Sequence, residues 1–186
     1  MPWKRVRHTR LRHLPLCLMA GAALLLYPAR LPAQASLEYQ VKAAFLLNFA
    51  KFVDWPPAAF ANSESPIAIC ILGKDPFGRT LDDLVQGEVV NGRKLIVRRI
   101  SQAPAAQTCQ IVFTPQTGKE TAELLSSRRP GVLTVGEGDE FVRQGGIIGF
   151  LLDSRHVRFD IDQKAAELAD LKLSSKLLAI ARAVQK

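Results

Sequence analysis

The sequence predicts a single α/β domain built on a mixed, mainly parallel sheet of about five to six strands flanked by helices. Short apolar runs rich in β-branched residues alternate along the chain with helix-like segments, which is typical of strands connected by helices that cover the faces of a sheet. Two later runs are separated only by Asp153 to His156, which predicts a hairpin. The hairpin would add an antiparallel strand and make the sheet mixed.

The first predicted element is a helix over residues 37–55, with Ser36 as a possible N-cap and Pro56 and Pro57 at its end. Its few polar residues scatter around the helix, so it needs cover on more than one side. The later elements, in order, are a strand at 67–72, a helix at 78–86, two strand-like pieces around an Asn-Gly turn at 89–100, a strand at 109–114, a helix at 118–127, a strand at 132–135, a helix at 139–144, the hairpin strands 147–152 and 157–161, and helices at 163–169 and 174–184.

Residues 1–35 are typical of a secretory signal peptide. Basic residues precede an apolar run from Leu14 to Tyr27, and Ala33-Gln34-Ala35 has the small residues of a cleavage site. The apolar run is shorter than the roughly 20 residues that cross a bilayer as a helix, and a retained anchor is the alternative. We therefore expect cleavage near Ala35 and a periplasmic domain of residues 36–186, long enough for one domain.

The charge of the expected mature domain argues against a nucleic-acid partner. The whole chain carries a net charge of +8, but six of its 25 basic residues and none of its 17 acidic residues lie within residues 1–35. The remainder therefore has 19 basic and 17 acidic residues, a net charge of +2. Binding to nucleic acid needs clustered, uncompensated Lys and Arg.

Only Cys70 and Cys109 remain after residues 1–35 are removed. An even pair in an exported protein is most simply interpreted as a disulfide, worth about 3–4 kcal/mol by the loop-closure model. Two separately buried thiols are the alternative.

No motif for catalysis, cofactor binding or metal binding is complete. Residues 73–80 nearly match a phosphate-binding loop, but Arg79 replaces the lysine and Pro76 removes a backbone N–H group. His156 is the single histidine of residues 36–186 and lies in the predicted hairpin turn. We therefore expect a protein that is not an enzyme and has no cofactor or metal.

Several motifs in fixed order resemble those of the YfiR-like family of periplasmic proteins, over nearly the whole of residues 36–186. They are EYQVKAAFLLNFAKFVDWP at 38–56, CILG at 70–73 with DPFG at 75–78, VLTVG at 132–136, GGII at 145–148 with VRF at 157–159, and LSSKLL at 173–178.

The resemblance implies a periplasmic regulator that represses an inner-membrane diguanylate cyclase by binding its periplasmic part, and so controls cyclic di-GMP and biofilm formation. It also implies a homodimer, and an outer-membrane lipoprotein that relieves repression by sequestering the regulator. Cys70 and Cys109 match a cysteine pair of the family, whereas a second pair of some relatives has no counterpart here.

The candidate surface for a partner or ligand has two parts. Aromatic residues gather near Trp55 and Phe60, and the alternative function is a small-molecule sensor with a pocket there and an arginine of the hairpin as its anion anchor. In the last third, Leu177, Ile180 and Val184 recur at helical spacing and could pack on a strand face as core or form a docking groove. The candidate residues are Trp55, Phe60, Phe150, Arg155, Arg158, Phe159, Leu177 and Leu178.

The exported protein is expected to begin near Ser36 and to occur in the soluble periplasmic fraction. N-terminal sequencing and mass spectrometry of the purified protein measure this directly. Recovery of peptides from residues 1–30 would show that the N-terminus is retained.

Overall fold

A computed structural model describes residue 1, residue 3 and residues 32–186, with side chains from residue 37 onward in the second part. The chain divides into two units, Met1–Leu31 and Pro32–Lys186, and every helix and strand below belongs to the second. The predicted signal peptide lies almost wholly outside the described residues. Among the residues described, none of the helices is both long and apolar enough to span a bilayer.

The fold is α/β with a mixed, mainly parallel sheet of eight strands, in the order β10-β8-β7-β6-β5-β2-β4-β3. The five central strands from β7 to β4 run parallel, while β8 is antiparallel to β7 and β3 to β4. A two-stranded sheet pairs β1 with β9. The strands are β1 (Val53–Asp54), β2 (Ile67–Leu72), β3 (Val89–Val90), β4 (Arg93–Ile100), β5 (Ile111–Thr114), β6 (Leu133–Glu137), β7 (Ile148–Asp153), β8 (His156–Asp162), β9 (Lys172–Leu173) and β10 (Ala183–Gln185).

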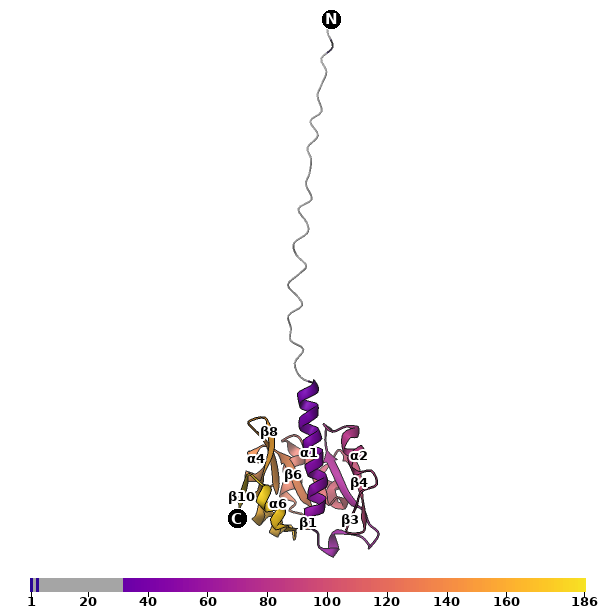
Figure 1. Ribbon diagram of the computed structural model, residues 1–186, viewed down its shortest axis with the longest axis vertical. Helices are drawn as coiled ribbons and strands as arrows, with labels where there is room; N and C mark the ends of the chain where they lie inside the picture. Colours follow the sequence, from indigo (N-terminus) through magenta and orange to yellow (C-terminus); the bar gives the residue numbers. More distant parts are fainter. Residues whose placement is uncertain (2, 4–31) are drawn as a thin grey trace. The chain divides into compact units, whose positions relative to one another are not determined.

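Helices cover both faces of this sheet, and α1 crosses one face between α2 and α6 (Figure 1). The opposite face carries η2, α3 and α4. The helices are α1 (Pro32–Phe52), η1 (Pro57–Ala59), α2 (Arg79–Val85), η2 (Ala103–Thr108), α3 (Lys119–Ser126), α4 (Asp139–Arg143), α5 (Gln163–Leu168) and α6 (Ser175–Ile180), of which η1 and η2 are 3₁₀ helices.

Strand β2 explains why two cores form, because all six of its residues are buried. Ile69 and Ile71 join the larger core beneath α1, whereas Ala68 and Cys70 join a smaller core beneath η2 and α3. Successive side chains of a strand point to opposite faces, so a continuous apolar run serves both.

Aromatic side chains join α1 to the hairpin formed by β7 and β8. The ring of Phe45 lies 5.2 Å from that of Phe159, and Phe49 lies 5.7 Å from Phe150, measured between ring centroids. Such pairs contribute about 0.5–1.5 kcal/mol each beyond the burial of their area. The predicted need of this helix for cover is met by the sheet, α2 and α6.

The short helix α4 packs closely on β6 and β7 because glycines face it. A Cβ atom on Gly136 would lie 2.3 Å from the Phe141 ring, and one on Gly149 would lie 2.8 Å from a methyl group of Val142. A larger residue at either position would displace α4.

Two predicted helix ends are wrong for reasons of tertiary pairing. The helix predicted to reach residue 55 ends at Phe52, because Val53 and Asp54 pair with β9. The helix predicted over 174–184 ends at Ile180. The following residues form β10 beside β8, where the Arg182 guanidinium binds the buried Asp160 carboxylate.

The predicted fold class is confirmed, but the predicted count of five to six strands is too low. The unexpected edge strand β10 adds one, and both members of the Asn-Gly hairpin, β3 and β4, are ladder strands. That hairpin and the one at Asp153 to His156 were predicted.

The turn from β2 to α2, which resembles a phosphate-binding loop in sequence, is held by its own aspartate. The Asp75 carboxylate accepts N–H groups from Phe77 and Gly78 at 2.7 and 3.3 Å. The Arg99 guanidinium then joins Asp75 to Asp82 on α2, with donor to acceptor distances of 2.5 to 2.9 Å. Two N–H groups of this turn that could face a phosphate are therefore already used.

Removal of the Arg99 guanidinium is expected to make stability less dependent on acid pH. This guanidinium holds the pKa of Asp82 below its ordinary value. A lowered carboxyl pKa stabilises the fold above the unfolded pKa of about 3.9, and this is lost as pH falls through the folded pKa. Arg99→Gln should lower the free energy of unfolding at pH 7 by about 0.2–1 kcal/mol, as for a partly exposed pair.

Thermal unfolding of Arg99→Gln between pH 7 and pH 2 measures this, with Lys74→Gln as an exposed control. The two curves should converge towards the acid end of this range, as Asp82 becomes protonated in both proteins. A difference that is constant over this range would show that the pairing does not involve the carboxylate's charge.

Candidate functional site

The strongest candidate site is a groove beside Trp55 and Phe60, at the amino edge of the central strands. Its volume is about 210 Å³, and it lies where the chain leaves β1, passes through η1 and enters β2. Both rings are half-buried. The lining residues are Asp54, Trp55, Pro57, Phe60, Ile67, Asn91 and Arg93, and we call this site the Trp55 groove.

Arg93 fixes the loop that forms one wall of the Trp55 groove. Its guanidinium carbon lies 3.7 Å from the centroid of the Phe60 ring, a cation-π contact. The same group donates to the carbonyl oxygens of Asn62, Ser63 and Ser65 at 3.0, 3.0 and 2.7 Å. One side chain therefore holds the ring and the loop together.

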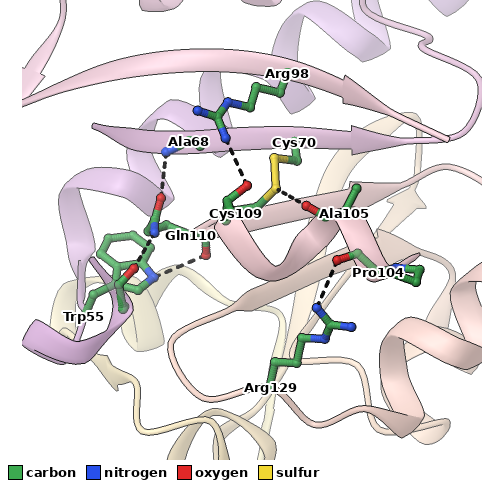
Figure 2. Close-up of a disulfide and its surroundings, with 11 residues drawn as sticks. Trp55, Ala68, Cys70, Arg98, Pro104, Ala105, Cys109, Gln110 and Arg129 are labelled. Carbon is green, nitrogen blue, oxygen red and sulfur yellow. Dashed lines mark hydrogen bonds between the residues drawn. A yellow bond between two sulfur atoms is a disulfide. The ribbon is translucent and has the colours of Figure 1, made fainter. Parts of the chain in front are cut away.

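Gln110 fixes the opposite wall, and Figure 2 shows its contacts. Its carbonyl oxygen accepts the indole N–H of Trp55 at 3.2 Å. Its side-chain oxygen accepts the N–H of Ala68 at 2.9 Å, and its side-chain nitrogen donates to the carbonyl oxygen of Ala59 at 2.7 Å. Gln110 is 4% exposed, so these bonds are shielded from water.

The residue before Gln110 belongs to the disulfide. Cys70 and Cys109 are bonded and buried, which confirms the predicted bridge and excludes the alternative of two thiols. The bond joins β2 to the start of β5 beneath η2, where the smaller core has mostly small side chains (Figure 2). It therefore supports the position of Gln110, and through it the Trp55 groove.

Gly131 packs directly against Ala59 of η1. It has a φ of +72°, and a Cβ atom there would lie 2.5 Å from the Cβ of Ala59. Its N–H donates to the carbonyl oxygen of Ala169 at 2.7 Å. Only glycine satisfies both the conformation and the close contact.

Three of the predicted candidates lie in the core rather than on a surface. Phe150, Phe159 and Leu177 are each at most 1% exposed, and the two rings belong to the aromatic stack with α1. They stabilise the fold and contact no solvent. Leu178 is half-buried on α6 and stays a candidate contact residue. The predicted packing partner Val184 lies on β10 instead of on a helix.

The predicted anion anchors do not lie at the Trp55 groove. Arg155 occupies the turn beyond the carboxyl end of β7, whereas Trp55 contacts the residue before the amino end of β5. These strands run in the same direction, so the two residues lie at opposite edges of the sheet. Arg158 is exposed on β8, paired with Leu151 of β7. The guanidinium of the groove is that of Arg93.

Sequence analysis also did not predict a buried charge cluster at the carboxyl edge of the sheet. The Lys42 ammonium group, on a residue only 3% exposed, contacts the carboxylates of Glu38 and Glu137 at 2.5 and 2.9 Å. The Tyr39 hydroxyl donates to Glu137 at 2.9 Å. Burial, together with the Glu137 charge, raises the pKa of Tyr39 well above its ordinary value, so the phenol stays protonated. The cluster ties α1 to β6.

The Trp55 groove has the character of a contact surface. His156 is exposed in its hairpin, and within residues 32–186 no group of three or more His, Cys, Asp or Glu side chains is arranged to hold a metal ion. The Trp55 groove offers aromatic surface, one arginine and fixed backbone, which are features of a contact surface.

Gln110→Ala is expected to loosen the Trp55 groove. It leaves the buried N–H of Ala68 without its acceptor, which should lower the free energy of unfolding by about 1–3 kcal/mol. Trp55 is the single tryptophan of residues 36–186, so its emission should shift to longer wavelength as the indole becomes more hydrated.

Denaturant titration followed by tryptophan fluorescence tests both effects, with Gln116→Ala in the exposed loop after β5 as the matched control. Unchanged stability and emission in Gln110→Ala would mean that Gln110 does not position the groove.

Comparison with known proteins gives a family and a structural likeness. The sequence profile described as YfiR/HmsC-like matches residues 39–182. A crystal structure titled a conserved domain protein from Vibrio cholerae O1 biovar eltor is similar at 11% identity and a TM-score of 0.45, over 79% of this chain and 60% of that chain. This chain thus spans less than two thirds of that protein.

Among curated proteins, none with a matching sequence was found. The profile match covers most of the chain, from α1 to the residue before β10, and includes every residue that builds the Trp55 groove. The chain belongs to the YfiR/HmsC-like family.

Proposed function

We propose that this protein represses an inner-membrane diguanylate cyclase by binding the periplasmic part of that enzyme, and so limits cyclic di-GMP and biofilm formation. The YfiR/HmsC-like family consists of regulators that are not enzymes, and membership suggests regulation of a diguanylate cyclase. The buried disulfide is consistent with the periplasm, where such bonds persist.

The observation that carries the proposal is the rigid aromatic surface of the Trp55 groove. The few residues that dominate the binding energy of protein interfaces are enriched in tryptophan, tyrosine and arginine. Here the indole, the Phe60 ring and the Arg93 guanidinium are each held by contacts within the protein. Little conformational entropy remains to be lost on binding, which favours affinity.

The size of the Trp55 groove favours a protein side chain over a free ligand. Its volume of about 210 Å³ lies below the range of roughly 300–1,000 Å³ that is usual for small-molecule sites. We therefore place the cyclase contact here, and propose that the outer-membrane lipoprotein competes for the same surface.

Trp55→Ala and Phe60→Ala are expected to weaken binding of the mature protein to the periplasmic domain of a diguanylate cyclase from the same cell. The loss should be at least tenfold, equivalent to about 1.4 kcal/mol, as for contact residues in the centre of an interface. Surface plasmon resonance with the purified domains measures the dissociation constants.

Leu152→Ala is the matched control, since Leu152 is an apolar residue that is 55% exposed at the opposite edge of the sheet. Trp55→Ala and Phe60→Ala also remove packing against the core and should lower the melting temperature, so binding is measured well below it and circular dichroism checks that each variant is folded. Failure of the wild-type protein to bind any such domain, with cyclic di-GMP unchanged on deletion, would refute the repressor function. Equal binding by all variants would refute the placement of the contact.

A further inference from the structure

A second cavity lies between α3 and α5, beside the start of β6. Its volume is about 320 Å³, within the usual range for a small-molecule site. Its interior is apolar, with Leu124, Val132 and Ile147 each at most 5% exposed, and Leu168 of α5 is 56% exposed beside it. We call it the α3–α5 cavity.

The lining of the α3–α5 cavity also includes three cations. Arg128 and Lys164 are exposed and Arg129 is half-buried. Within residues 37–186 none of the three forms an ion pair with a carboxylate, and the Arg129 guanidinium contacts the neutral oxygens of Ser127 and Pro104. Their charge is therefore available to a bound anion.

The one acidic residue of the lining, Asp162, offsets only part of this charge, because three cations line the cavity beside a single carboxylate. Asp162 is the N-cap of α5, and its carboxylate accepts the N–H of Ala165 at 2.8 Å. This hydrogen bond and the positive end of the helix already stabilise its negative charge. The lining therefore combines an apolar interior with a net positive charge.

We propose that the α3–α5 cavity binds a small carboxylate that carries a compact apolar chain. The chain would displace water from the surfaces of Leu124, Val132 and Ile147, and the carboxylate would contact Arg128, Arg129 and Lys164. A volume near the lower limit for ligand sites fits a molecule of this size and excludes a peptide helix. The inference does not depend on the proposed function, because the two sites share no lining residue.

Isothermal titration calorimetry of the mature protein with octanoate tests the proposal. Octanoate is expected to bind with a stoichiometry of one. Acetate has the same charge without the chain, and octylamine has the same chain with the opposite charge. Each should bind at least tenfold more weakly than octanoate. Absence of octanoate binding, or equal binding of octylamine, would overturn the proposal.

Amino-acid substitutions in the lining test whether octanoate binds in the α3–α5 cavity. Arg128→Gln combined with Arg129→Gln should weaken octanoate binding at least tenfold, whereas Arg155→Gln, an exposed arginine outside the lining, should leave it unchanged. Leu168→Glu adds a negative charge at an exposed position and should also weaken octanoate binding. It provides an independent test if the double variant folds poorly. Octanoate affinity that survives both the double variant and Leu168→Glu would show that the ligand binds elsewhere.

Discussion

The contact between the aromatic rings of α1 and those of the β7–β8 hairpin determines where the rest of the chain can lie. Phe45 and Phe49 come from the first helix, and Phe150 and Phe159 from strands about a hundred residues later. Removal of one such ring from a core typically costs about 3–5 kcal/mol. Because α1 is fixed on the sheet, its last carbonyl oxygen, at Phe52, meets the N–H of Ser174, and β1 can pair with β9. Trp55, which follows β1, is thereby held at a defined position.

Local patterns were sufficient to predict the sheet, since its central strands are short apolar runs between turn signals. Ile67 to Leu72 was predicted as a strand buried on both faces, and all six residues are buried. The Asn91-Gly92 turn identified one hairpin. The errors lie where pairing with a distant segment overrides local preference. Val53 and Asp54 continue a helical pattern but pair with β9. Residues 183–185 also continue a helical pattern but pair with β8.

The candidate site was only half predictable for a related reason. Aromatic composition identified Trp55 and Phe60, but their partners come from elsewhere in the chain. The Gln110 side chain is hydrogen-bonded to Ala68 and Ala59, which lie 42 and 51 residues away in the sequence. No rule of sequence spacing connects residues so far apart. A glutamine next to a cysteine carries no local signal of burial. The predicted anchors on the hairpin were wrong because the parallel order of the strands puts them at the opposite edge of the sheet, a property of topology that composition does not show.

The loop between α3 and β6 connects the two candidate sites physically. Val132 lines the α3–α5 cavity, while its neighbour Gly131 packs against Ala59 with no space for even one additional carbon atom. The carbonyl oxygen of Ala59 in turn accepts a hydrogen bond from Gln110, which holds Trp55. Close-packed interiors transmit displacement, so a shift of Val132 would move η1 and the wall of the Trp55 groove with it. Coupling of binding free energies is reciprocal, so any effect of an occupied cavity on the affinity of the groove would equal the effect of an occupied groove on the affinity of the cavity.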